Sequence, residues 1–129
     1  MASEEPPLPT EAELELLGVM WRLGPSTVRE IHNALPPERD VRYTTVLKLL
    51  QIMAEKGLVR RDESRRAHVY APAANASRTQ GRIVADLLER AFGGSASRLV
   101  QQALSSRPAS DEEIREIRAF LDSLEGGRS

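Results

Sequence analysis

Three short motifs that mark helix starts constrain the fold of this chain more than any other feature of its sequence. Each motif pairs a Ser or Thr with a Glu three residues later: Thr10 with Glu13, Thr27 with Glu30, and Ser110 with Glu113. In such a capping box the hydroxyl and the carboxylate each accept a hydrogen bond from a backbone N–H that the helix leaves unpaired. Apolar residues at helical spacing follow every pair, so we predict a mainly helical chain.

The residues that end helices give the order of the elements. Gly24-Pro25, Pro36-Pro37 and Lys56-Gly57 end helices predicted over about residues 11–23, 27–35 and 43–56. Residues 58–62 and 67–71 are predicted to form two strands joined by a charged tip at 63–66. Ser77 with Gln80 predicts a further cap, and helical spacing continues to residue 124 with a break at Gly93-Gly94.

This order predicts the fold class. Three helices and a hairpin in about 60 residues are typical of a winged helix-turn-helix domain, whose third helix enters the major groove of DNA. We therefore predict a mainly α fold with a small β-hairpin wing, followed by a C-terminal helical dimerisation region. The predicted bounds are a disordered lead-in at 1–9, the winged domain at 10–73, the dimerisation region at 76–125 and a disordered tail at 126–129. A small helical domain with a solvated hairpin is the alternative.

Charge is unevenly placed along the chain, although the net charge is only -1. Both ends are acidic, whereas residues 42–70 contain seven Lys and Arg residues against three Asp and Glu residues. A basic block between acidic ends favours a polyanionic partner for that block alone.

Several function classes find no support in the sequence. The chain contains no cysteine, which excludes disulfides, thiolate catalysis and Cys-based zinc or copper sites. With only His32 and His68, a multi-His metal site within one subunit is disfavoured, and no paired nucleophile and base is present. No stretch approaches the length of a membrane helix, and the acidic, Pro-rich start is unlike a signal peptide. We expect a cytoplasmic protein without direct membrane insertion, with no enzymatic activity, cofactor or metal.

The third helix carries the candidate DNA-reading side chains. Its inward stripe is Val46, Leu49, Leu50 and Met53. Burying that stripe turns an acid-free polar set outward, which we predict to contact DNA: Arg42, Tyr43, Thr44, Thr45, Lys48 and Gln51. Thr hydroxyls suit phosphate oxygens, Arg and Lys reach guanine or phosphate, and Gln can pair with adenine. The alternative is an ordinary solvated helix face.

The hairpin supplies a second set of cations. Arg60, Arg61, Arg65 and Arg66 can straddle the phosphate backbone, and we predict Arg65 and Arg66 at the tip as DNA contacts. A solvated charged turn is the alternative.

The C-terminal helices carry more apolar surface than about 50 residues can close among themselves. The stripes consist of Ile83, Leu87 and Leu88 on one helix and Ile114, Ile117, Leu121 and Leu124 on another. We predict that they pack against the same surface of a second copy, which would place two recognition helices one DNA turn apart. The alternative is that these helices fold back on their own domain.

Several segments, taken in this order, resemble the BlaI/MecI/CopY family of penicillinase-type repressors. They are 14–17 (Leu-Glu-Leu-Leu) with Trp21, 27–31 (Thr-Val-Arg-Glu-Ile), 43–46 (Tyr-Thr-Thr-Val), 55–59 (Glu-Lys-Gly-Leu-Val), 67–70 (Ala-His-Val-Tyr), 92–94 (Phe-Gly-Gly) and 99–100 (Leu-Val). The resemblance implies a homodimer that binds a palindromic operator and represses resistance or homeostasis genes. By position, it implies recognition-helix contacts from Arg42, Tyr43, Thr44, Thr45 and Lys48, and wing contacts from Arg65 and Arg66.

Two branches of that family differ from this chain. The copper-responsive branch carries C-terminal Cys pairs, which this chain lacks. The β-lactam branch is derepressed by proteolysis linked to a membrane sensor protease, which the resemblance implies as one route here. Residues 99–104 nevertheless read Leu-Val-Gln-Gln-Ala-Leu, without the Asn-Phe pair of some members.

The predicted function is a sequence-specific DNA-binding transcriptional repressor that binds a palindromic double-stranded operator as a homodimer. The alternative is a winged-helix protein-interaction module without DNA binding. Salt-dependent binding to duplex DNA separates the two, because the alternative predicts none.

Overall fold

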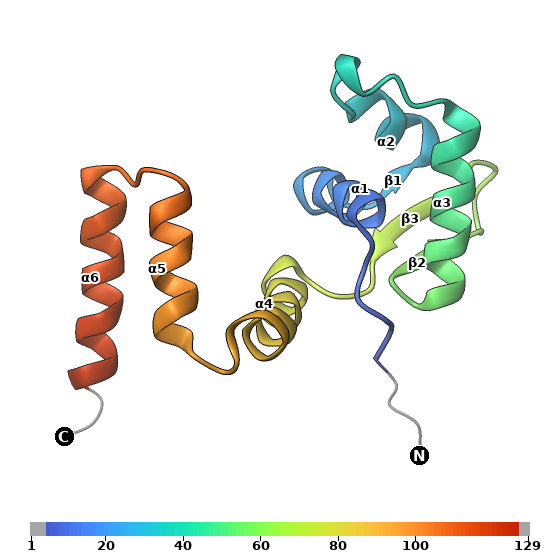
Figure 1. Cartoon of the computed structure of the whole chain (residues 1–129). Coiled ribbons are helices and arrows are strands. Elements are labelled where there is room, and N and C mark those ends of the chain that lie inside the picture. The colour runs from blue at the N-terminus through green and yellow to red at the C-terminus, as the bar shows by residue number, and fades with distance from the viewer. Residues whose placement is uncertain (1–4, 127–129) are drawn as a thin grey trace. The chain divides into compact units, whose positions relative to one another are not determined.

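The computed structural model describes residues 5–126 and divides into two compact units, Met1–Val84 and Ala85–Ser129. The first unit contains α1 (Glu11–Leu23), β1 (Ser26–Thr27), α2 (Val28–Ala34), the 3-10 helix η1 (Pro37–Arg39), α3 (Tyr43–Lys56), β2 (Val59–Asp62) and β3 (Val69–Pro72). The unit boundary falls inside α4 (Ala76–Phe92), and α5 (Ala96–Ser106) and α6 (Asp111–Gly126) follow (Figure 1). The disorder predicted at 1–4 and 127–129 lies outside the described residues, and Gly126 is the last residue of α6.

Capping side chains begin the helices, largely where the sequence predicts. Thr10 Oγ1 accepts a hydrogen bond from the backbone N–H of Glu13 at 3.2 Å, and Thr10 N–H donates to the Glu13 carboxylate at 2.9 Å. The box at Thr27 is formed in the same way, and Ser110 Oγ accepts from Glu113 N–H at 3.1 Å. The predicted cap at Ser77 is wrong. Asn75 caps α4 instead, because its Oδ1 accepts from the N–H of Arg78 at 2.8 Å and Asn is at least as good a cap as Ser.

A three-stranded antiparallel sheet with the order β1-β3-β2 completes the first unit. The predicted hairpin is present as β2 and β3, with Arg61 opposite Tyr70 and Arg60 opposite Ala71. The sequence did not predict β1, which pairs Ser26 with Tyr70 and leads directly into α2. The predicted fold class is confirmed as a mainly helical chain with a winged helix-turn-helix arrangement (Figure 1).

The core of the first unit joins its three helices to the sheet. Its buried residues are Leu16, Leu17, Val19, Met20, Val28, Ile31, Leu35, Val46, Leu50, Met53, Leu58, Val59 and Tyr70. Leu49, predicted in the inward stripe of α3, is only partly buried. The indole N–H of Trp21 donates to the carbonyl of Ala74 at 3.0 Å, which fixes the segment before α4 to α1. This core holds α3 rigidly against the rest of the unit.

A buried ion pair also joins α1 to α3. Glu13 is only 2% exposed, and Lys56 Nζ lies 2.7 Å from its carboxylate. Burial by itself raises the pKa of Glu13, but hydrogen bonds from Lys56 and Thr10 outweigh it, so the pKa lies below its usual value of 4.5. The capping carboxylate of α1 is therefore charged and also anchors the C-terminal end of α3.

The segment before α1 contacts α4. Arg82 donates to the carbonyl oxygen of Pro6 at 2.6 Å, and Glu5 pairs with Arg78 and Arg82 at 3.1 and 3.3 Å. These contacts differ from the disorder expected for residues 5–9. They arise because two arginines one helical turn apart on α4 present their cations to the acidic lead-in.

Candidate nucleic-acid interface

The N-terminal half of α3 presents a polar face to solvent. Arg42 is its N-cap, and its first turn contains no acidic residue. The six side chains predicted to contact DNA are all exposed: Arg42, Tyr43, Thr44, Thr45, Lys48 and Gln51. On the opposite face, Val46, Leu50 and Met53 are fully buried. The structure therefore leaves the whole predicted set accessible around the N-terminal half of one helix, where the positive end of the helix dipole adds to their attraction for anions.

Tyr43 is held in place by two residues of α2. The His32 and Tyr43 rings meet edge to face with centroids 6.1 Å apart, and His32 Nε2 lies 2.6 Å from the carbonyl oxygen of Val41. The guanidinium carbon of Arg29 lies 5.6 Å from the centroid of the Tyr43 ring, within cation–π range. Arg29 was not among the predicted site residues. Its position beside α3 arises from how α2 packs, which spacing in the sequence does not reveal.

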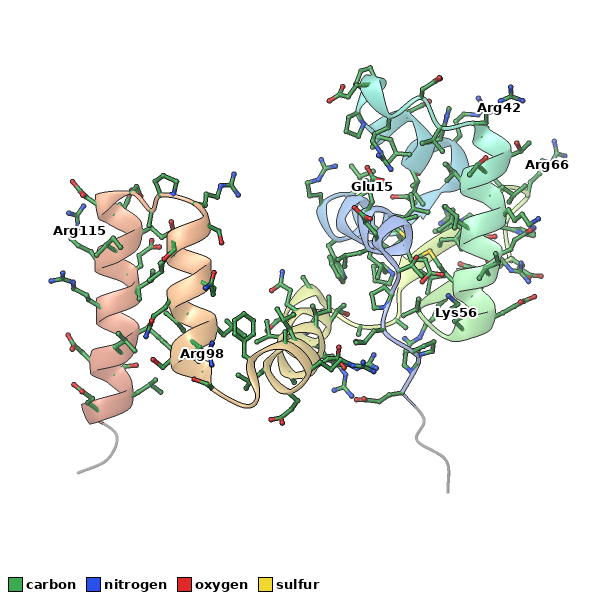
Figure 2. All side chains as sticks on the ribbon, in the orientation of Figure 1. Glu15, Arg42, Lys56, Arg66, Arg98 and Arg115 are labelled. Carbon is green, nitrogen blue, oxygen red and sulfur yellow. The ribbon has the colours of Figure 1, made fainter. Side chains whose placement is uncertain are left out.

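The tip of the wing is a tight, charged turn. Asp62 Oδ1 accepts a hydrogen bond from Ser64 N–H at 2.9 Å. Hydrogen bonds from Ser64, together with the nearby Arg65 cation, lower the pKa of Asp62. Both predicted wing contacts, Arg65 and Arg66, are exposed, and Figure 2 shows Arg66 on the same side of α3 as Arg42. The turn thus presents two exposed cations near α3.

The seven residues predicted to form the dimer interface differ in their exposure to solvent. Leu87, Leu121 and Leu124 are 45, 52 and 53% exposed. The remaining four, Ile83, Leu88, Ile114 and Ile117, are partly buried. The prediction missed Phe120, which is 61% exposed beside Leu121, and Val100 and Leu104 on α5. Neither α5 nor α6 contains a buried residue.

The described residues contain neither a cluster of metal ligands nor a membrane-spanning helix. Within residues 5–126, no three His, Asp or Glu side chains gather closely enough to hold a metal ion. Over the same residues, every helix is too short or too polar to cross a lipid bilayer.

Comparisons with known proteins extend over both units. The chain matches the family described as Penicillinase repressor over residues 9–123. It is 33% identical over 118 residues to the transcriptional regulator BlaI of Mycobacterium tuberculosis. This aligned segment covers 91% of this chain and 85% of that protein. Among solved structures, a CopR repressor shares 31% identity over 52% of this chain and 97% of its own, with a TM-score of 0.45. A MarR family protein from Bacillus stearothermophilus shares 22% identity over 92% of this chain and 74% of its own, with a TM-score of 0.48.

Proposed function

This chain belongs to the penicillinase repressor family, and from that premise we propose that it represses transcription by binding a specific DNA operator. Its relatives are transcriptional regulators and not enzymes, and the chain is likewise a regulator. The finer proposal is that two copies bind one palindromic operator, with selectivity from α3 and much of the affinity from phosphate contacts.

The exposed, acid-free face of α3 is the observation that carries this proposal. Thr44 and Thr45 lie in the first turn, where hydroxyls and unpaired backbone N–H groups suit phosphate oxygens. Lys48 and Gln51 lie one and two turns further along the same face, at positions from which side chains can reach base edges. An ordinary solvated helix would place acids among these residues as well.

The apolar surface of the C-terminal helices supports the homodimer. Leu121 and Leu124 leave about half of their surfaces in water, which is unfavourable unless another surface covers them. A single winged domain also contacts few phosphates, so tight binding needs two domains held on one duplex. A twofold dimer then requires a palindromic operator, because each half-site meets the same recognition helix.

Selection of duplexes from a random pool by the full chain, followed by affinity measurements at several salt concentrations, tests the proposal. Arg42→Ala and Lys48→Ala should weaken binding to the selected duplex while the fold is retained. Loss of a phosphate contact should reduce the slope of log affinity against log salt concentration by about 1. Loss of a base contact should reduce the binding free energy by roughly 1–3 kcal/mol at one operator position. Arg107→Ala, outside the first unit, is the control and should leave affinity unchanged. Failure to enrich any sequence, or unchanged affinity in both α3 variants, contradicts the proposal.

We also propose derepression by proteolysis linked to a membrane sensor protease, supported by the family resemblance. Residues 99–104 lie within α5, so a protease would act on a locally opened form of that helix. Co-expression with a membrane sensor protease from the same genome, followed by mass analysis of the chain, tests this proposal. Cleavage within α5 on induction supports it, and an intact chain during full derepression contradicts it.

A further inference from the structure

A cleft of about 490 Å³ lies between α2, α3 and the hairpin of the first unit. Its lining residues are Thr27, Val28, Arg29, Tyr43, Leu47, Gln51, Arg61, Arg66, Ala67, His68 and Tyr70. Three of these residues are arginines, and they come from three different elements: α2, β2 and the tip of the hairpin. The lining contains no acidic residue. Glu63 lies outside the lining but pairs with Arg61, so the cleft holds an excess of positive charge rather than three unpaired cations. Such a concave surface attracts a compact anion.

Strand geometry separates the two neighbouring arginines of β2. Successive side chains of a strand point to opposite faces of the sheet. Arg61 accordingly lines the cleft beside α3, whereas Arg60 lines a different groove with Arg78 and Arg82 of α4. The two residues therefore carry the same charge on adjacent positions but face different surfaces.

Two of the cleft arginines are held in position by neighbouring groups. Arg61 lies opposite the fully buried Tyr70 in the pairing of β2 with β3, and it forms an ion pair with Glu63 at 2.6 Å. Arg29 lies over the ring of Tyr43, and the rings of Tyr43 and His32 meet edge to face. Ordering a long side chain before binding lowers the entropy that the complex must lose. Both guanidinium groups are therefore prepared to bind an anion.

We propose that this cleft binds a phosphodiester of the DNA backbone, with Arg29 and Arg61 as its direct ligands. The proposal rests on the proposed function. The cleft lies between the two surfaces that carry the candidate DNA contacts, so a strand of the duplex that reaches both α3 and the wing passes over it. Arginine suits this role because its planar guanidinium donates two hydrogen bonds to phosphate oxygens. Glu63 holds Arg61 in the free protein, and the phosphate replaces that carboxylate on binding.

The salt dependence of DNA affinity in three matched variants tests the proposal. Arg29→Gln and Arg61→Gln should each weaken binding of the full chain to the selected duplex about tenfold. Each should also flatten the slope of log affinity against log salt, by up to about 0.9 per bound protomer, because one phosphate is neutralised at this site. Random-sequence duplex should be affected by similar factors, because phosphate contacts carry no sequence information. Arg60→Gln is the control. The sequence groups Arg60 with the hairpin cations, but the structure places it on the other face of β2, in a groove with Arg78 and Arg82. The variant therefore removes the same charge from the same strand away from the cleft, and its slope should match that of the wild type.

A double-mutant cycle tests the exchange of Glu63 for phosphate. Glu63→Gln should increase DNA affinity a few-fold in the wild type, because Arg61 is then free, and should increase it less in the Arg61→Gln background. An equal gain in both backgrounds would overturn the exchange.

Thermal unfolding of each variant shows whether weaker DNA binding results from loss of folded protein. Should Arg61→Gln lower stability through its contact with Tyr70, Arg29→Gln, on the exposed face of α2, carries the test alone. Salt slopes equal to that of Arg60→Gln would overturn the cleft proposal, even while Arg42→Ala and Lys48→Ala still weaken binding. A wild-type chain that binds no duplex would instead overturn the proposed function.

Discussion

The two units of this chain differ in where their apolar side chains lie. In the first unit, Leu50, Met53 and Tyr70 are fully buried among three helices and the sheet. In the second, α5 and α6 have no buried residue, and Phe120 and Leu121 are more than half exposed. Burying a large apolar side chain stabilises a fold by about 1.5–3 kcal/mol. The first unit gains this stabilisation within one chain, whereas the second needs a covering surface, which we propose is a second copy.

The largest effect should come from a charge on the exposed stripe of α6. Leu121→Asp should produce monomers and weaken binding to the selected palindrome by about 10²–10⁴-fold, because two half-sites are no longer held together. Ala119→Asp is the control, since Ala119 lies on the opposite side of α6 at 100° per residue. Sedimentation gives the oligomeric state and fluorescence anisotropy gives the affinity. A Leu121→Asp chain that still dimerises and binds like the wild type would contradict the claim that a second copy covers the apolar stripe of α6.

Truncating one Leu in each unit should reduce stability in two different ways, because only the first unit buries its Leu within one chain. Leu50→Ala should lower the free energy of unfolding by about 2–5 kcal/mol at every protein concentration, because it leaves a cavity within one chain. Leu124→Ala should lower stability by an amount that depends on protein concentration, because it weakens association. Urea unfolding at two concentrations a hundredfold apart makes the comparison. Equal and concentration-independent losses would show that both side chains are buried within one chain.

The Glu13–Lys56 pair gives a smaller, pH-dependent effect confined to the first unit. Lys56→Met should lower the free energy of unfolding by about 1–3 kcal/mol near neutral pH, because it leaves a buried carboxylate without its partner. The pKa of Glu13 lies below 4.5 in the fold, so the pair stabilises the fold above that pH, and this contribution is lost as pH falls through the folded pKa. The difference between wild type and variant should therefore shrink below pH 4.5. A difference that stays constant into acid would contradict a charged Glu13.

Neutralising the wing tip should have the smallest effect. The double variant Arg65→Gln with Arg66→Gln should weaken binding to the selected duplex and to random duplex by similar, few-fold factors, because phosphate contacts are independent of sequence. Competition assays with both duplexes at one salt concentration provide the measurement. A loss confined to the selected duplex would make the wing a reader of bases.

Local signals allowed much of the fold to be predicted. Capping boxes join residues three apart, so Thr10 with Glu13 and Thr27 with Glu30 could be recognised without any knowledge of the tertiary structure. β1 could not be recognised, because two residues show no alternation and become a strand only by pairing with β3. The sequence pattern places the cap of α4 two residues too late, because Asn75 and Ser77 are both good caps and the pattern does not decide between them.

In the candidate site too, local sequence patterns predict some residues, and tertiary packing places the others. The exposed face of α3 followed from its apolar stripe, because one helix has one buried side. The sequence did not single out Arg29, and it could not separate Arg61 from Arg60 among the hairpin cations. The packing of α2 and the facing of β2 are set by contacts distant in sequence. Phe120 was missed because the regular stripe at Ile117 and Leu121 passes beside it.

The stoichiometry of the DNA complex tests the central claim most directly. Sedimentation of the full chain with its selected duplex measures how many chains bind and whether they bind together. The expected result is a single complex of two chains per duplex that forms without a one-chain intermediate and is lost in Arg42→Ala with Lys48→Ala at moderate salt. One chain per duplex, or a complex that the double variant forms equally well, would contradict the claim that two α3 helices read one operator.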